Sequence, residues 1–411
     1  MSTAVPVEET TEAVADLLRI AEPGDRLLGA AVAQLGAAEA RDRIVAPRSD
    51  DVEAVLHAAG IHGLEASGAA AALAVERWRT RRAELDAARD LRIMARLGAR
   101  LLVPGDADWP RGLDDLGLDA PLGLWARGPG SLARLCSGSV ALVGSRAADD
   151  YGIHLAKSLA FDAVGAGRTV LSGGAYGIDA AAHTAALVGA HGASHGGTDG
   201  GVGAGGAGTV AFMAGGVDRF YPRGNDALLS RIAEDWIVVS EAPPGGTAMR
   251  HRFLLRNRII AACAAATVVV QAGWRSGAIN TANRAAELLR PVGAVPGPVT
   301  STSSAGCHRL IREGAAVLIT GYADLAELVD DIDPTAGRAN EDAQAPLRAT
   351  DDLSTEELRV YSALPTRRGA EISALAVRAG LDPRTAMATV AGLELAGLAR
   401  RGDHGWTKAR P

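Results

Sequence analysis

The chain has 411 residues, of which 48% are apolar and 22% are charged, and its formal net charge is −6. This length allows about two to four domains and a hydrophobic core that needs no disulfide or metal to hold it together. The cysteines Cys136, Cys263 and Cys307 lie far apart and form no C-x-x-C pair, which excludes a disulfide framework and a zinc-finger-type site.

The N-terminus does not resemble a secretory signal, because MSTAVPVEETTEAVADLL is acidic and lacks a basic start followed by an apolar run. The longest apolar stretch, Ile259 to Val270, is shorter than the roughly 20 residues that span a bilayer. We therefore expect a cytoplasmic protein that does not contact a membrane.

Residues 1–100 are predicted to form a helical (SAM/HhH-like) module. Apolar residues recur at helical spacing in four stretches, Ala13–Ile20, Leu27–Leu35, Val52–Ala59 and Ala70–Trp78. No chemical signature accompanies them, so the sequence gives this module no function of its own.

Residues 101–325 are predicted to form an α/β domain, an extended Rossmann-like, mostly parallel sheet. Short β-rich stretches alternate with helical ones at Val140–Val143, Thr169–Leu171, Val210–Met213, Trp236–Val239, Thr267–Val270, Val292–Val295 and Ala316–Ile319. Apolar strands with helical crossovers are typical of a parallel sheet covered on both faces. Ligands of such sheets bind beyond the carboxyl ends of the strands.

The Gly-rich stretch 189–208 is predicted to be a flexible surface loop. Its histidines, His191 and His195, lack an adjacent cysteine or carboxylate, so we predict no metal site there. Residues 326–350 are predicted to be an acidic linker.

The C-terminal residues 351–411 are predicted to form a winged-helix-like domain. Ser354–Ala363, Ile372–Ala379 and Pro383–Ala396 have helical patterns, and Leu398–Trp406 has that of a hairpin. Ser354 and Glu357 have the spacing of a capping box at the start of the first helix.

Glycine, serine and arginine follow most of the predicted strands. The candidates for anion contact at these turns are Gly144, Ser145, Arg146, Ser172, Gly173, Gly174, Ser276 and Gly277. Glycine lets backbone amides approach an anion, and serine and arginine add donors. Residues 131–320 also carry 16 Lys and Arg against 12 Asp and Glu. Tight turns alone are the alternative, but so many on one edge favour phosphate binding.

Nucleotide-cofactor motifs do not follow the predicted strands. The first strand turn is G-S-R and the second lacks G-x-G-x-x-G, and the sequence contains no G-x-x-x-x-G-K-[ST]. Matches to G-x-G-x-x-G and G-x-S-x-G occur only within the low-complexity Gly-rich stretch 189–208. We therefore predict no bound cofactor.

The densest cation cluster runs from Arg250 to Arg258. Its candidate contacts to nucleic acid are Arg252, Phe253, Arg256, Asn257 and Arg258. Guanidinium groups meet phosphates, and a base can stack on an aromatic ring, as in proteins that bind single strands. A solvated basic helix face is the alternative, and Phe253 alone is more often a core residue.

Three polar residues are interpreted as structural rather than catalytic, and for two of them, Asp179 and His183, the reason is that no nucleophile lies near them in the sequence. Asp179 and His183 are four residues apart at the start of a helix, and Glu241 follows a strand. We expect these three to orient loops, although an acid–base role is chemically open to them. His308 fits a ligand contact or a plain helix position equally well.

Taken in order, these motifs resemble the DNA-processing protein A (DprA, also called Smf) family. They are G-S-R, S-G-G-A-Y-G-I-D-A-A-A-H, G-G-V-D-R-F-Y-P-R-G-N, S-E-A-P-P-G, F-L-L-R-N-R-I-I-A, S-G-A-I-N-T-A, A-V-P-G and S-A-G-C-H-R-L-I-R-E-G-A. The resemblance implies single-stranded DNA binding without turnover chemistry, usually as a homodimer. It also implies help in loading a RecA-type recombinase during natural transformation.

Two other functions remain as hypotheses. A LOG-type nucleotide phosphoribohydrolase would carry P-G-G-x-G-T-x-x-E, but Pro244-Gly245-Gly246-Thr247 is followed by no glutamate. A transcription-like regulator would use the C-terminal domain, yet its candidate recognition helix, Pro383–Ala396, contains Arg384 as its one cation.

Overall fold

The computed structural model describes residues 7–46, 68–194, 207–330, 353–366, 368–402 and 404–409. The chain divides into two compact units, Met1–Pro334 and Thr335–Pro411. The expected helix at 52–59, His195 with most of its loop, and linker residues 331–350 lie outside the described residues. The first five residues of the predicted linker, 326–330, are helical.

The N-terminal helices pack into the same core as the sheet. They are α1 (Val7–Ile20), α2 (Arg26–Leu35), α3 (Ala37–Val45), α5 (Gly68–Thr80) and α6 (Ala87–Arg96). Leu17, Leu28, Trp78 and Met94 are buried in that shared core. The sequence pattern did not predict α3 and α6, whose short amphipathic turns have few large apolar residues.

A nine-stranded sheet forms the centre of the first unit. Its strands are β1 (Ala99–Leu102), β2 (Leu124–Arg127), β3 (Val140–Gly144), β4 (Val170–Ser172), β5 (Thr209–Met213), β6 (Ile237–Ser240), β7 (Ala266–Gln271), β8 (Val292–Ala294) and β9 (Val317–Leu318). Their order is β1-β2-β6-β5-β4-β3-β7-β8-β9. The strands from β3 to β9 pair in parallel, which confirms the α/β prediction. The antiparallel strands β1 and β2, at one end of the sheet, were not predicted.

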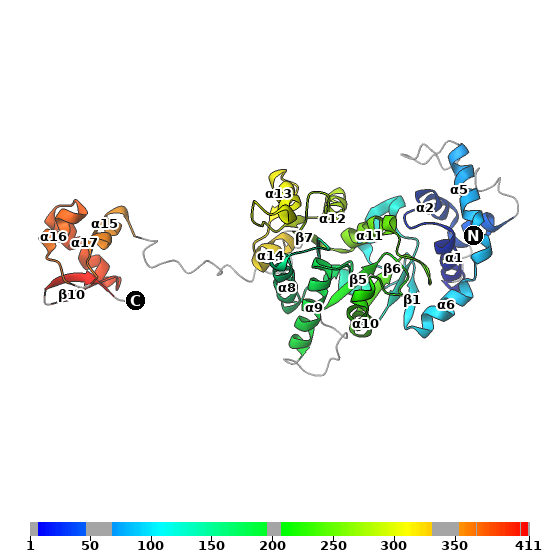
Figure 1. Ribbon diagram of the computed structural model, residues 1–411, viewed down its shortest axis with the longest axis horizontal. Coiled ribbons are helices and arrows are strands. Elements are labelled where there is room, and N and C mark those ends of the chain that lie inside the picture. The colour runs from blue at the N-terminus through cyan, green and yellow to red at the C-terminus, as the bar shows by residue number, and fades with distance from the viewer. Residues whose placement is uncertain are drawn as a thin grey trace, which may run out of the picture. The chain divides into compact units, whose positions relative to one another are not determined.

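Helices cover both faces of this sheet, as expected for parallel strands. One face carries α8 (Asp150–Gly165), α9 (Ile178–Ser194) and α10 (Asp226–Asp235), and the other carries α11 (Arg250–Cys263) and α12 (Gly277–Glu287) (Figure 1). The shorter helices are α7 (Leu132–Cys136), α13 (Ala305–Arg312) and α14 (Tyr322–Asp330), with 3-10 turns at Arg82–Glu84, Arg111–Asp119, Arg223–Asn225 and Thr302–Ser304.

The strand order reverses between β3 and β7. From β3 the chain adds β4, β5 and β6 on one side, and then β7, β8 and β9 on the other. The carboxyl ends of β3 and β7 are tied together where Ser145 N–H donates to the Gln271 carbonyl over 2.7 Å. Such a reversal leaves a crevice outside the strand ends, where α/β proteins bind ligands.

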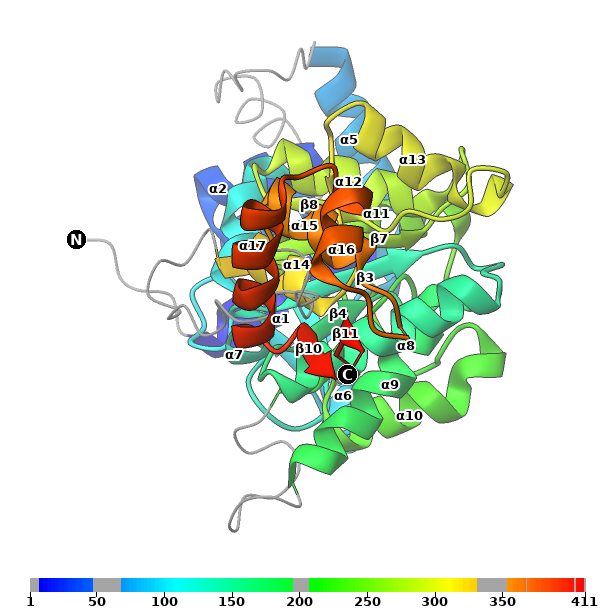
Figure 2. The ribbon, with the colours of Figure 1, turned by 90° about the vertical axis from the view of Figure 1, so that its left-hand side faces the viewer.

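The second unit contains three helices and a hairpin, as predicted. These are α15 (Thr355–Ala363), α16 (Ile372–Ala379), α17 (Pro383–Leu395), β10 (Ala399–Gly402) and β11 (Gly405–Lys408) (Figure 2). The predicted capping box between Ser354 and Glu357 is formed. Val360, Leu375, Val390 and Trp406 belong to a separate small core, so this unit has its own hydrophobic centre.

Two classes of feature are missing from the described ranges. None of their helices combines the length and the apolar character needed to cross a bilayer. Their His, Cys, Asp and Glu residues form no cluster of three or more that could hold a metal ion.

Candidate nucleic-acid interface

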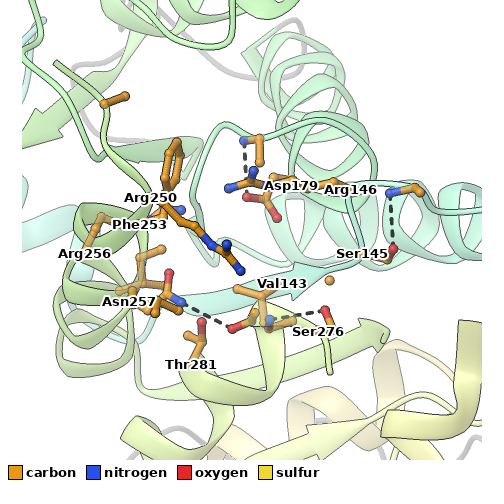
Figure 3. Close-up of a pocket in the computed structure, with 18 of the residues that line it drawn as sticks. Val143, Ser145, Arg146, Asp179, Arg250, Phe253, Arg256, Asn257, Ser276 and Thr281 are labelled. Atoms are coloured by element: carbon orange, nitrogen blue, oxygen red, sulfur yellow. Dashed lines mark hydrogen bonds between the residues drawn. The ribbon is translucent and has the colours of Figure 1, made fainter. Parts of the chain in front are cut away.

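A cleft of about 750 Å³ lies at the reversal point, between the end of β3 and helices α11 and α12 (Figure 3). The sequence-predicted residues that line it are Gly144, Ser145, Arg146, Asp179, Phe253, Arg256, Asn257, Ser276 and Gly277. They come from four separate segments of the chain. The fold therefore brings most of the candidates to one place.

Arginines dominate the charge of this cleft. Arg146, Arg250 and Arg275 line it with exposed side chains, and none of them has an acidic partner among the residues that the structure describes. Within the same described lining, Asp179 is the one carboxylate. Three guanidinium groups without counter-charges favour an anionic ligand.

Arg146 and two aromatic rings form one wall of the cleft. The guanidinium carbon of Arg146 lies 4.5 Å from the centre of the Phe253 ring. Phe253 in turn meets Tyr221 with ring centres 5.8 Å apart and planes tilted by 55°. This contact holds the Arg146 side chain over an aromatic surface and leaves its donors for a ligand.

The N-terminus of α12 forms the opposite wall. Ser276 caps the helix by accepting a hydrogen bond from Ala278 N–H over 3.3 Å, and the first turn has no acidic residue. Asn257 donates to the Gly277 carbonyl over 3.3 Å and so ties α11 to this helix start. Gly277 has open space around the position of a Cβ. Ala278 N–H and Ile279 N–H are both engaged with Ser276, so the positive end of the helix dipole is what favours an anion here.

Arg256 is buried beneath the cleft rather than extended into it. Its Nη1 donates to the Gly173 carbonyl over 2.7 Å and to the Phe212 carbonyl. Burial lowers the pKa of this guanidinium to about 10. Because these carbonyls lie at the ends of β4 and β5, Arg256 joins α11 to the sheet, and only part of the side chain faces the cleft.

Arg252 and Arg258 were predicted to contact nucleic acid, and the structure places both away from the cleft. Arg252 pairs with Glu22 of the N-terminal helices. Arg258 pairs with Glu241 over 2.9 Å and donates to the Asp119 carbonyl over 2.7 Å. Their donors are engaged inside the protein, and we leave both out of the interface.

The turn Ser172–Gly174 is also buried, so it does not line the cleft as predicted. Ser172 Oγ donates to the Leu142 carbonyl over 2.7 Å. A Cβ on Gly173 would lie 2.1 Å from Nη1 of Arg256. Glycine is required at this position because a side chain would collide with Arg256. The glycine therefore serves the packing of the turn rather than the binding of an anion.

The three polar residues interpreted as structural, and His308, make contacts within the protein. Asp179 accepts a hydrogen bond from Ala175 N–H over 3.3 Å, and burial raises the pKa of its carboxyl group. His183 is buried, and its Nδ1 lies 2.7 Å from Thr209 Oγ1 rather than against Asp179. Glu241 pairs with Arg258. His308 Nε2 lies 2.9 Å from the Gly297 carbonyl.

Sequence reasoning missed the lining residues with polar or aromatic side chains Tyr221, Arg250, Arg275 and Thr281. Arg250 belonged to the cation cluster, and Arg275 directly precedes the predicted Ser276, so proximity to those motifs was the available signal. Counted from Pro244, the glutamate position of P-G-G-x-G-T-x-x-E is Arg252, which pairs with Glu22 away from the cleft. The cleft therefore has no carboxylate from this turn.

Comparison with known proteins shows that this chain resembles members of one family. Residues 100–330 match the family model described as DNA recombination-mediator protein A. A DNA processing protein DprA of Mycobacterium tuberculosis (strain H37Rv) is 43% identical, over 97% of this chain and 95% of that protein. DprA of Streptococcus pneumoniae (strain R6) is 38% identical over 51% of this chain and 67% of its own length. The X-ray structure of S. pneumoniae DprA matches with a TM-score of 0.55 and 26% identity, covering 78% of this chain and 96% of that one.

Proposed function

The chain belongs to the DNA recombination-mediator protein A (DprA/Smf) family, and we propose that it binds single-stranded DNA in the cleft between α11 and α12. The observation that carries this proposal is the set of three exposed arginines that line the cleft without an acidic partner among the described residues. Phosphates would bind to Arg146, Arg250 and Arg275, with the positive end of the α12 dipole beside them.

The aromatic wall favours a single strand over a duplex. Phe253 and Tyr221 present ring surface beside Arg146, and a base can reach such a surface only when it is not paired and stacked within a duplex. Contacts to backbone phosphates carry no sequence information. We therefore propose binding that is largely independent of sequence.

Fluorescence anisotropy with a labelled oligo-dT tests this proposal. Arg146→Ala should weaken binding at least about tenfold, because it removes a phosphate donor and the partner of Phe253. Arg92→Ala is the matched control, since Arg92 is exposed on α6 at the far edge of the sheet. Equal affinity of the wild type and both variants would overturn the assignment.

Family membership supports three further elements of the proposal. The protein would act in the cytoplasm as a homodimer, and it would present the bound strand to a RecA-type recombinase. Light scattering tests the dimer. Formation of recombinase filaments on strands coated with a single-strand-binding protein, with and without this chain, tests the loading step.

The proposed function includes no catalytic step and no cofactor. Asp179, the one carboxylate in the described lining, is held by the Ala175 amide and protonates more readily than usual because it is buried. Incubation with AMP should release no adenine. Release that depends on Asp179 would instead support the phosphoribohydrolase alternative.

A further inference from the structure

Trp274 stands out among the tryptophans of this chain. Its side chain is 53% exposed, whereas the other five tryptophans are each at most 6% exposed. Burial of an indole is strongly favourable, so an exposed one without a packing role is informative. Trp274 lies in the loop between β7 and α12, directly before Arg275, which lines the cleft.

The loop that carries Trp274 is fixed on both sides. Gly306 N–H, at the start of α13, donates to the Ala272 carbonyl over 2.7 Å. Within the loop, Ser276 N–H donates to the Gly273 carbonyl over 3.1 Å. A Cβ on Gly306 would lie 2.7 Å from the Gly273 carbonyl oxygen, so helix and loop are in close contact. The exposed ring of Trp274 therefore lies on a turn whose backbone is fixed by hydrogen bonds.

Arg309 holds the ring itself. Its guanidinium carbon lies 4.8 Å from the centre of the Trp274 ring, and Arg309 is half-buried on α13. Nε of Arg309 has no hydrogen-bond partner. A cation against an indole fixes the ring orientation and places positive charge beside it. Arg146 and Phe253 make the same kind of pair inside the cleft, at 4.5 Å.

We propose that Trp274 is a second base-stacking position, just outside the cleft, on which an unpaired base of the bound strand rests. The inference rests on the proposed binding of single-stranded DNA and extends its path from the cleft along the start of α12 toward α13. A phosphate held by Arg275 would bring a neighbouring base to Trp274. Stacking on an aromatic side chain tolerates any base, because every base has a flat face.

Two readouts on the full-length chain separate this inference from the proposed function. Anisotropy of labelled oligo-dT reports binding, and intrinsic tryptophan fluorescence reports contact with an exposed indole. Oligo-dT should quench the wild-type fluorescence, and Trp274→Phe should remove this quenching while affinity stays within about threefold. Trp274→Ala should weaken oligo-dT binding about fivefold to hundredfold.

An abasic oligonucleotide of equal length provides the matched control ligand. Trp274→Ala should bind it as the wild type does, because phosphate contacts are retained and no base is present to stack. Arg146→Ala should weaken binding of both oligonucleotides. Circular dichroism should show unchanged melting for the Trp274 variants, since the side chain is exposed.

Each outcome decides a specific point. Absence of oligo-dT binding by the wild type would overturn both the proposed function and the role of Trp274. Binding that depends on Arg146, with Trp274→Ala at wild-type affinity, would overturn the stacking position alone. Quenching that persists in Trp274→Phe, or an equal loss on the abasic strand, would overturn it as well.

Discussion

Glu22 and Arg252 lie 230 residues apart and form an ion pair with two hydrogen bonds. Nε and Nη2 of Arg252 donate to the two carboxylate oxygens of Glu22 over 2.8 and 2.9 Å. Arg81 and His251 reach the same carboxylate over 2.8 and 3.1 Å. One side of α11 is thus fastened to the N-terminal helices, while Arg250, Phe253 and Asn257 on the same helix line the cleft.

Glu22→Gln should lower the free energy of unfolding by about 1–3 kcal/mol, as expected for a partly buried ion pair with several partners. The Arg252 hydrogen bond lowers the pKa of Glu22 to about 2. Stability from this carboxylate is therefore complete above its ordinary pKa of 4.5 and is lost as pH falls toward about 2. Urea unfolding at several pH values measures both effects.

Glu39→Gln is the control for this prediction. Glu39 pairs with Arg43 one turn away on the surface of α3, and such pairs contribute about 0.3–0.5 kcal/mol. If Glu22→Gln and Glu39→Gln lower the free energy of unfolding equally, the ion pair between Glu22 and Arg252 does not stabilise the fold.

The salt dependence of oligo-dT affinity should report the number of phosphate contacts in the cleft. Three or four contacts predict a slope of log affinity against log salt of roughly −2 to −3 for a single strand. Arg250→Ala and Arg275→Ala should each reduce the magnitude of this slope by about 0.7, and Arg92→Ala should leave it unchanged. Anisotropy titrations over a range of salt concentrations give the slopes. If the Arg250→Ala/Arg275→Ala double variant kept the wild-type slope, the strand would have to bind outside this cleft.

Arg256→Ala should destabilise the protein more than it changes the salt slope. The substitution leaves the buried Gly173 and Phe212 carbonyls without their donor, which costs about 2–3 kcal/mol. Arg146→Ala should cost less than about 0.5 kcal/mol, because that side chain is exposed. Thermal and urea melts measure stability. A stable Arg256→Ala with a slope reduced by 0.7 would instead make Arg256 a phosphate contact.

His183 should make the protein sensitive to mild acid. Burial, reinforced by the Arg256 charge, lowers its pKa from 6.5 to about 3. Between these values the unfolded chain binds a proton that the folded protein does not, so stability falls as pH drops below 6.5. His183→Gln should reduce this pH dependence by up to about 1.4 kcal/mol per pH unit in urea titrations. His154→Gln, at an exposed position on α8, should not change it.

Deletion of residues 351–411 should leave oligo-dT affinity within about twofold of the wild type. The cleft lies entirely in the first unit, and the second unit has its own core. Comparing a labelled single strand with a duplex tests the tail separately. A loss of affinity for the duplex alone would show that the C-terminal unit binds duplex DNA. An equal loss of affinity for the single strand and the duplex would make this unit part of the main interface.

The sequence alone determined the layout of the sheet domain and most of the cleft. Apolar stretches of strand length identified β3 to β9, because buried parallel strands need continuous apolar residues. Gly144 to Arg146 and Ser276 with Gly277 followed two of those strands, and the carboxyl ends of parallel strands share one edge. The antiparallel strands β1 and β2 escaped this pattern because each contains an arginine, Arg100 or Arg127, and so lacks a continuous apolar run.

Tertiary structure alone decided which arginines of α11 line the cleft. Cations occur around the circumference of this helix, so helical spacing showed which arginines share a side but not which side is covered. Arg252 pairs with Glu22 and Arg258 pairs with Glu241, and both arginines are buried through these contacts. A charge is stable in the interior only beside a partner, and only the folded chain shows where the partners lie.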